Sequence, residues 1–408
     1  MVVLKSIVAS SPSTATAVSE LAGAVDAAGV DPQLACVFYD ADHEDAPIFD
    51  YVRKRFPSAA LLGGTSCGGV MSEAGLGGAG SIGLLLIADN NGDYGSAAVQ
   101  LESDPSGRAE QALHAALAAA DCAGELPELI WIYQAPGQEE AVIAGLRRVV
   151  DDRCPIIGGS SADNAVAGDW RQLGPDGPMT DGLVVAVLFS SGGIGFAFQG
   201  GYEPTGASGV VTGVIHDPPA DGEHIARVSG RRIRAIDGEP AAEVYNRWIG
   251  GVLTEKLDTG GSILADTTMY PLGIDTGKVD GVTHYLLVHP EAIVQDRALS
   301  TFAAVEEGTR IHGMRGDKDR LVQRAGKVAA AAAQALPGGS QNLAGGLIVY
   351  CGGCMLAVGG EMPQIAAAVS ASFNGMPFMG CFTFGEQGCV LERNVHGNLM
   401  ISAVAFGR

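Results

Sequence analysis

The sequence has little positive charge and no long hydrophobic run. It carries 25 Lys and Arg against 46 Asp and Glu, which gives a formal net charge of −21. This charge repels the phosphates of nucleic acids and anionic membranes, so nucleic acid is not an expected partner. The apolar run at the N-terminus is too short for a signal sequence, and the longest later stretch, "VAAAAAQAL", is far short of a membrane span. We therefore expect a cytoplasmic protein without membrane insertion.

Several catalytic and metal-binding patterns are also missing. The eight histidines include no H-x-x-x-H or H-E-x-x-H spacing, so no metal site is predicted from them. Ser66 lies in a Gly64-x-Ser66-x-Gly68 pattern, which resembles the nucleophile elbow of serine hydrolases. Such an elbow requires a helix directly after the serine, whereas a glycine-rich stretch follows Ser66. We therefore expect no catalysis by Ser66.

The eight cysteines lie far apart on apolar runs, as expected for reduced thiols in a cytosolic chain. Cys351 and Cys354 form a C-x-x-C pattern. Zinc requires four ligands, so this pair alone is no zinc site, although Cys381 and Cys389 follow in the same part of the chain. Three interpretations stay open: ordinary buried thiols, a redox-sensing pair, or ligands of a metal or haem.

The composition and the hydrophobic patterning predict a mixed α/β fold. Hydrophobic residues make up 47% of the 408 residues, enough for two or three domains of roughly 150 residues with large cores. A unit of strand, helix, glycine-rich turn and strand occurs three times, starting near Leu34, Leu129 and Gly346. Continuous Val, Ile and Leu runs predict buried strands, and the helix returns the chain parallel. The last strand of each unit has no helix before it, so we expect a hairpin there and mixed β-sheets flanked by helices.

The region between the second and third units has a different pattern. Residues 200–336 are rich in short strand patterns, with helices expected at 240–253 and 316–336. Glycine and proline cluster at 199–209, which predicts one domain over residues 1–202 and a second over 203–408. An arginine run in this region is interpreted as a solvated strand face; its members are Arg227, Arg231, Arg232 and Arg234.

The three glycine turns are the predicted ligand site. A strand–helix–strand crossover places such a turn at the carboxyl edge of a sheet, where ligand crevices form. Glycine lets backbone N–H groups approach a ligand, and the nearby hydroxyls and carboxylates suit a small zwitterion. The candidate ligand-binding residues are Thr65, Ser66, Ser160, Ser161, Asp163, Asn164, Cys351, Cys354, Thr383, Glu386 and His396. The alternative is that the turns only pack strand against strand.

We expect the ligand to lie in a cleft shared by the two domains, because pockets favour domain interfaces. One wall would hold Ser66, Ser161 and Asp163, and the other would hold Cys351, Glu386 and His396. The rival arrangement is a pocket wholly within the C-terminal domain.

These residues resemble the FIST family, a two-part sensory module of bacterial and eukaryotic signal transduction. The turns at 63–66 and 158–161 resemble its N-terminal signature, and "DGEPAAEVY", "EGT" and "MGCFTFGEQG" resemble its C-terminal motifs. The resemblance covers nearly the whole chain. Two departures stand out: Cys354 replaces the usual arginine, and the family's His-Asn pair is split as His396 and Asn398.

The resemblance implies a ligand-binding sensor that is not an enzyme and needs no cofactor. Its ligand would be an amino acid or a similar small metabolite. Because the sequence shows no kinase or cyclase segment, the output would pass through a separate protein, such as a histidine kinase or a cyclic-dinucleotide enzyme. Two alternatives stay open. One branch of the family resembles haem-based nitric oxide sensors, in which His396 would be the haem ligand, and the thiols would also allow a thiol-dependent or acyl-transfer enzyme.

Overall fold

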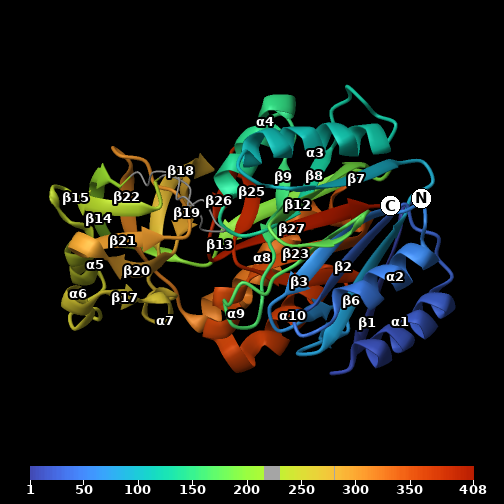
Figure 1. Cartoon of the computed structure of the whole chain (residues 1–408), viewed down its shortest axis with the longest axis horizontal. Coiled ribbons are helices and arrows are strands. Elements are labelled where there is room, and N and C mark those ends of the chain that lie inside the picture. The colour runs from blue at the N-terminus through green and yellow to red at the C-terminus, as the bar shows by residue number, and fades with distance from the viewer. Residues whose placement is uncertain (216–229, 280) are drawn as a thin grey trace.

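The structure, a computed structural model, describes residues 1–215, 230–279 and 281–408 and contains three units with the same order of elements (Figure 1). Unit 1 comprises β1 (Val3–Ser10), α1 (Thr14–Ala28), β2 (Leu34–Asp40), α2 (Asp45–Arg55), β3 (Ala60–Ser66), β4 (Val70–Ser72), β5 (Gly75–Leu76) and β6 (Ser81–Ala88). Unit 2 comprises β7 (Asp93–Gln100), α3 (Pro105–Ala119), β8 (Leu129–Gln134), α4 (Glu139–Val150), β9 (Ile156–Ser160), β10 (Gln172–Gly174), β11 (Gly177–Met179) and β12 (Gly182–Phe189).

Unit 3 is interrupted after its first strand by a separate region. The unit comprises β13 (Ile194–Gly200), α8 (Lys318–Gln334), η2 (Gly339–Asn342), β23 (Leu343–Cys351), α9 (Gly352–Val358), η3 (Gly359–Glu361), α10 (Met362–Ser372), β24 (Phe378–Thr383), β25 (Glu386–Val390), β26 (Arg393–Gly397) and β27 (Met400–Gly407). The middle region comprises β14 (Glu203–Val214), β15 (Arg232–Ile236), β16 (Glu239–Pro240), α5 (Ala241–Trp248), α6 (Lys256–Thr259), β17 (Gly261–Ser262), α7 (Leu264–Thr267), β18 (Leu272–Val279), β19 (Val282–Val288), β20 (Pro290–Val294), η1 (Gln295–Arg297), β21 (Ala298–Thr301) and β22 (Arg310–Arg315). It forms the left-hand lobe in Figure 1.

Each unit builds a mixed sheet with the same register. In unit 1, Val37 of β2 pairs in parallel with Gly63 of β3 and antiparallel with Leu84 of β6. The pairs β8–β9 and β8–β12 repeat this arrangement in unit 2, and β23–β24 and β23–β27 repeat it in unit 3. The predicted mixed α/β fold is confirmed. The last strand of each unit was expected to form a hairpin with the glycine strand before it, and this expectation is wrong. The last strand lies between the first two strands of its unit, as β6 does between β1 and β2.

A small hairpin from another unit occupies the free edge of each glycine strand. The β10–β11 hairpin of unit 2 pairs with β3, β25–β26 of unit 3 with β9, and β4–β5 of unit 1 with β24. Each six-stranded sheet therefore contains strands of two units, and the three exchanges form a closed ring. The units are consequently interdependent parts of one fold.

The exchanged hairpins explain the glycines that the sequence concentrates in the turns. Gly64 has a φ of +149°, and a Cβ atom at this position would lie 2.2 Å from the carbonyl oxygen of Arg171 on the incoming hairpin segment. At Gly159 a Cβ atom would lie 2.4 Å from the Thr383 methyl group. Glycine is required here because atoms of another unit approach closely, which is the strand-packing alternative to ligand contact.

The main core lies where the three sheets face one another. Alternate residues of β2, β8 and β23 point inward, among them Phe38, Trp131 and Val349, and they pack into one buried cluster. The other face of each sheet is covered by helices: α1 and α2 on unit 1, α3 and α4 on unit 2, and α8 and α10 on unit 3. Strands buried on both faces account for their continuous apolar sequences.

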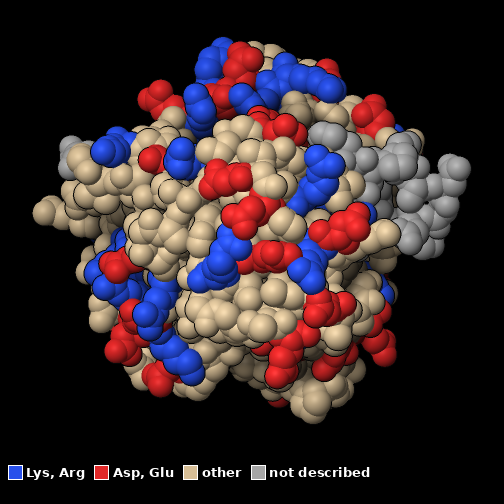
Figure 2. Space-filling view, turned by 90° about the vertical axis from the view of Figure 1, so that its left-hand side faces the viewer, with Lys and Arg blue, Asp and Glu red and all other residues tan. Residues whose placement is uncertain are grey.

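The predicted domain boundary at residues 202 and 203 falls between β13 and β14. Sheets nevertheless cross it, since β13 pairs with β27 and the β25–β26 hairpin pairs with β9. The middle region forms its own nine-stranded sheet with a separate apolar cluster. Acidic and basic side chains alternate on its outer face instead of gathering by sign (Figure 2).

One described helical run, Gly352–Ser372, is long and apolar enough to cross a membrane, with a mean hydropathy of 1.2. It comprises α9, η3 and α10, and 33% of its most apolar stretch is buried inside the protein. Since α10 packs its buried residues in the core of unit 3, length and composition alone do not make it a membrane helix. The absence of membrane insertion stays a prediction.

Candidate functional site

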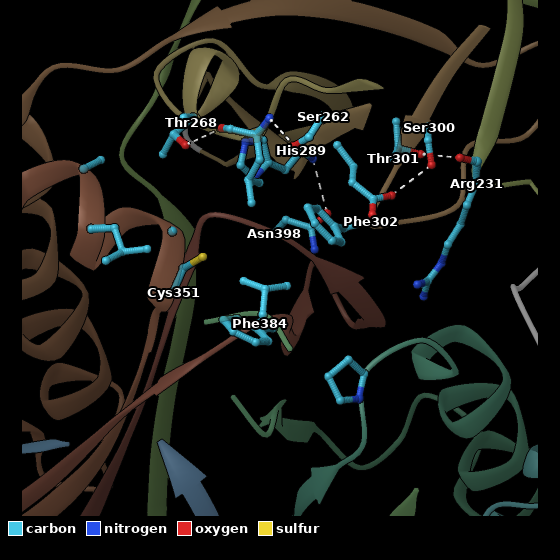
Figure 3. A pocket seen from close by; sticks show the side chains of 18 of the residues that line it. Arg231, Ser262, Thr268, His289, Ser300, Thr301, Phe302, Cys351, Phe384 and Asn398 are labelled. Carbon is cyan, nitrogen blue, oxygen red and sulfur yellow. Dashed lines mark hydrogen bonds between the residues drawn. The ribbon is translucent and has the colours of Figure 1, made fainter. Parts of the chain in front are cut away.

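A cavity of about 1000 Å³ lies in the part of the chain that the structure describes and is large enough for a ligand. Three parts of the chain line it: residues 136–170 of unit 2, residues 231–302 of the middle region, and Lys318 with residues 351–398 of unit 3. Figure 3 shows side chains from these parts around one space. This cavity lies where the cleft shared by both halves of the chain was predicted. Most of the residues that were expected to line the cleft do not line this cavity.

Unit 2 contributes the turn before α4 and the loop of residues 161–171. Asp163, which is 2% exposed, organises the loop by accepting hydrogen bonds from the backbone N–H groups of residues 165, 166, 167, 168 and 169. Burial alone would raise the pKa of Asp163, but these N–H donors outweigh it and lower the pKa. The same loop carries Val166 and Trp170, which line the cavity. Asp163 therefore shapes the cavity wall without facing the cavity.

Asp163→Asn is expected to lower the free energy of unfolding by about 3 kcal/mol, because an amide nitrogen would face several backbone N–H groups in place of an acceptor. The pKa of Asp163 is depressed on folding, so its stabilising contribution is present above about pH 4 and is lost as the pH falls through its folded pKa. Urea unfolding of both proteins at pH 7 and pH 3 measures this, and the difference between them should shrink at pH 3. An equal difference at both pH values would contradict the assignment.

The middle region contributes a buried histidine and an aromatic ring. His289 is 3% exposed, and burial lowers its pKa to about 4, so the imidazole is neutral at physiological pH. Its Nε2 atom lies 3.1 Å from the Thr267 hydroxyl, and its ring centroid lies 5.8 Å from that of Phe302. Both rings line the cavity.

Unit 3 contributes Cys351, Phe384 and Asn398. The Phe384 ring stands perpendicular to Trp170 of unit 2, with centroids 6.1 Å apart. Asn398 is 2% exposed, and its Oδ1 accepts a hydrogen bond from the His289 backbone N–H at 3.3 Å. Its Nδ2 is buried without a hydrogen-bond partner. Aromatic side chains from unit 2, unit 3 and the middle region therefore border the same space.

A buried ion cluster joins all three parts at one wall of the cavity. An Arg231 guanidinium nitrogen lies 2.6 Å from a carboxylate oxygen of Glu139 and 2.6 Å from one of Glu140. The His396 Nδ1 atom lies 3.2 Å from Glu140 Oε1. The interpretation of the arginine run as a solvated strand face is therefore wrong for Arg231, whose side chain is 11% exposed. Arg227 lies outside the described residues.

The cluster is also where a cation could be held in the described part of the chain. Ligand atoms of Glu139, Glu140 and His396 all lie within 4.8 Å of one another. The Arg231 guanidinium, however, already bonds both carboxylates and supplies the positive charge. The group is therefore a salt-bridge network in which arginine takes the place of a metal ion.

A second buried polar group surrounds the C-x-x-C pair. A hydrogen bond with Cys354 and burial together raise the pKa of the Cys351 thiol well above its usual value. Burial and the neighbouring Cys351 raise the pKa of Glu386 as well, so this carboxyl is held in its neutral form. Glu386 accepts hydrogen bonds from the Thr383 hydroxyl at 2.8 Å and from the Met400 N–H at 3.1 Å. Its contacts within the protein are those of a structural group.

Glu386→Gln is expected to stabilise the protein at alkaline pH. The pKa of Glu386 is raised on folding, so its contribution to stability is fully present below about pH 4.3 and is lost as the pH rises through the folded pKa. A glutamine keeps the neutral shape and does not ionise. Thermal unfolding should show similar midpoints for both proteins at pH 4.5 and a higher midpoint for the variant at pH 9. A lower midpoint for the variant at pH 9 would contradict this account.

Of the residues predicted to bind a ligand, only Cys351 lines the large cavity. Asp163 and Asn164 border a second cavity of about 230 Å³. The others are bonded within the protein: Thr65 to the backbone of Arg171, Ser66 to Phe382 N–H, Ser160 to Glu139, Ser161 to Gln172, Asn164 to Asp40, Cys354 to Tyr202, Thr383 to Glu386, and His396 to Glu140. Their polar atoms hold the exchanged hairpins and turns together. Direct ligand contact by these side chains stays a prediction.

The sequence patterns did not identify several residues that line the cavity. Trp170, His289, Phe302 and Phe384 are single aromatic residues in the loops between strands, and no spacing distinguishes them. Asn398 had a signal, since it belongs to the split His-Asn pair.

Neither His396 nor Cys351 is well placed to bind the iron of a haem in the cavity. His396 does not line the large cavity, and its Nδ1 faces Glu140. Cys351 does line it, but haem iron binds thiolate, and the raised pKa of Cys351 keeps its thiol protonated. His396 and Cys351, the haem ligands considered from the sequence, therefore do not fit the group, and no chemistry is assigned through it.

Among solved structures, the chain is similar to two cyanuric acid hydrolases. The structure from A. caulinodans is 14% identical and has a TM-score of 0.29 over 48% of this chain and 71% of that chain. The second is 8% identical and has a TM-score of 0.34 over 100% of both chains. PurLQS from Thermotoga maritima is 8% identical, with a TM-score of 0.21 over 77% of this chain and 72% of that one. No curated protein matches the sequence significantly.

The sequence matches two family models that together span most of its length. The FIST N domain matches residues 33–239, which include unit 1 from β2 onward and the whole of unit 2. The FIST C domain matches residues 241–389, which run from α5 to β25. FIST domains are associated with sensory signal transduction. The cavity is lined by residues of both matched domains. The chain belongs to the FIST family.

Proposed function

We propose that this protein is a small-molecule sensor that binds its ligand in the cavity between units 2 and 3 and the middle region. The observation that carries the proposal is the composition of the cavity wall. About 1000 Å³ is enclosed by segments from three structural parts, which the ion cluster of Arg231, Glu139, Glu140 and His396 ties together. A ligand held by separate parts makes different contacts when these parts shift, which is what a sensor requires.

The signal would leave through a separate protein in the cytoplasm, such as a histidine kinase or a cyclic-dinucleotide enzyme. The ligand would be a small metabolite. The cavity is at the upper end of the range of roughly 300–1,000 Å³ of pockets for drug-sized ligands, so a single free amino acid would leave much of it to water. This supports a metabolite larger than most amino acids.

A thiol-dependent or acyl-transfer enzyme has less support. Cys351 lines the cavity, but reactive cysteines have a lowered pKa, whereas the pKa of Cys351 is raised. The neighbouring Glu386 carboxyl is held neutral and does not act as a base at physiological pH. Binding without turnover is the function that these groups favour.

A thermal-shift screen of the intact protein tests the proposal, with amino acids, ring-containing metabolites and haem as compounds. A ligand present at a hundred times its dissociation constant should add about 2.7 kcal/mol of stability. Haem binding is also measured by absorption, because bound haem gives a Soret band, and we expect no such band with this protein. Turnover of any compound that disappears in Cys351→Ala would overturn the sensor proposal in favour of an enzyme.

A further inference from the structure

The buried part of the cavity wall carries little net charge, whereas the other charged lining residues, Arg231, Arg232, Glu291 and Lys318, are partly or fully exposed. Three of the lining residues with ionisable side chains are buried, namely Glu139, His289 and Cys351. Glu139 is paired with Arg231 at 2.6 Å. The low pKa of His289 keeps its imidazole neutral, and the raised pKa of Cys351 keeps its thiol protonated. An ammonium or carboxylate group placed at this depth would lose its hydration without gaining a free counter-charge.

Asn398 offers one hydrogen bond to the same space. Its Oδ1 accepts the His289 N–H, and this bond fixes which end of the amide faces the protein backbone. The Nδ2 end is buried and has no partner, although buried polar groups are generally paired. In Figure 3, Asn398 lies among His289, Phe302 and Phe384. These N–H donors are free to bond an acceptor atom of the molecule that fills the cavity.

The aromatic side chains define the shape of that occupant. Trp170 and Phe384 border the cavity from units 2 and 3, and Phe302 and His289 border it from the middle region. Aromatic rings prefer offset-stacked or edge-to-face contacts with other rings. Walls of this kind favour a planar ring over a flexible polar chain.

We propose that the ligand is a planar, uncharged ring compound whose carbonyl-type oxygen accepts a hydrogen bond from Asn398 Nδ2. This inference rests on the proposed sensor function and narrows its ligand from small metabolites in general to one chemical class. It separates an aromatic carbonyl compound from an aromatic amino acid, which has a similar ring but carries two charges.

Flavone and coumarin serve as probes of this class, with naphthalene as a ring without an acceptor and tryptophan as a charged ring compound. Binding is measured by isothermal titration calorimetry on the full chain. We expect saturable binding of flavone or coumarin, weaker binding of naphthalene, and no binding of tryptophan.

Asn398→Asp tests the hydrogen bond. The variant keeps an acceptor for the His289 N–H and replaces the free donor by a second acceptor. It should weaken binding of flavone and coumarin by at least about tenfold and leave naphthalene unchanged within about twofold. Asn394→Asp is the matched control, because Asn394 is also buried but bonds Ile156 and Cys154 and does not line the cavity.

Phe384→Leu provides a second variant that introduces no charge and keeps an apolar side chain. It should weaken flavone and coumarin binding several-fold, whereas Phe373→Leu, in the core of unit 3 away from the cavity, should not.

The outcomes separate the ligand class from the sensor function. Tight binding of tryptophan or another free amino acid, with none of flavone or coumarin, would overturn the ligand class and leave the sensor standing. Equal affinities in Asn398→Asp and the wild type would remove Asn398 as the donor and contradict the inference. If neither these probes nor any compound of the metabolite screen binds the folded protein, both proposals fail.

Discussion

Arg231→Met is expected to lower the free energy of unfolding by about 3–5 kcal/mol, because it leaves the buried carboxylates of Glu139 and Glu140 without their counter-charge. Glu139 is 2% exposed and, among the described residues, keeps its bonds to Ser160 and to the Gly137 N–H. Removing one partner of a buried pair costs far more than the net value of the pair. Urea unfolding at pH 7 measures the loss.

The control is Arg297→Met in the same region. Arg297 also pairs with two carboxylates, those of Glu243 and Asp258, but on the exposed surface, where ion pairs contribute little. Its removal should change stability only slightly. Combining Arg231→Met with Glu139→Gln and Glu140→Gln should recover most of the loss, since no uncompensated charge remains. A single Arg231→Met variant as stable as Arg297→Met would contradict the assignment of a buried cluster.

The pH dependence of this loss follows from the direction of the shifts. Burial opposes ionisation of Glu139 and Glu140, but Arg231 and His396 outweigh it and lower the pKa of both. The stabilising contribution of each glutamate is therefore present above about pH 4.3 and is lost as the pH falls through the folded pKa. In Arg231→Met the two groups protonate more easily. The difference between wild type and variant should consequently be larger at pH 7 than at pH 4.

Ala357→Trp is expected to weaken ligand binding about a hundredfold, equivalent to about 2.7 kcal/mol, by placing an indole inside the cavity. Ala357 lies on α9, is partly exposed, and lines the cavity, so the larger side chain can enter the open space without displacing core residues. The midpoint of thermal unfolding should change little. Affinity is measured with the compound that gives the largest thermal shift in the screen.

Ala367→Trp is the matched control for this variant. Ala367 is exposed on α10, in the same helical run, and does not line the large cavity. It should bind the ligand as tightly as the wild type. Unchanged affinity in Ala357→Trp would place the ligand outside the cavity and contradict the proposed site.

The repeated unit could be read from the sequence because its signals are local. The apolar strand runs at Leu34–Asp40 and Leu129–Gln134 are continuous because both faces of these strands are buried. The glycine turns at 63–64 and 158–159 marked the ends of the parallel crossovers. These patterns, with the family motifs, were sufficient for the fold class and the family.

The role of the glycine turns was decided by pairing between units. Whether Gly64 faces a ligand or a strand depends on Arg171 and Gln172, which the chain reaches only after another unit has begun. No local pattern specifies that a hairpin crosses to the neighbouring sheet. The polar residues beside the turns were therefore predicted to bind a ligand, whereas the structure uses them to hold the exchanged hairpins.

The distance along the chain over which an interaction acts separates what the sequence by itself determined from what the tertiary structure decided. The sequence determined the strands, the helices and their repetition, because hydrophobic periodicity and glycine act over a few residues. The tertiary structure decided the cavity and the burial of Arg231, whose partner Glu139 lies 92 positions away along the chain. An arginine is stable in the interior only where the fold brings carboxylates to it, and that depends on how distant segments pack.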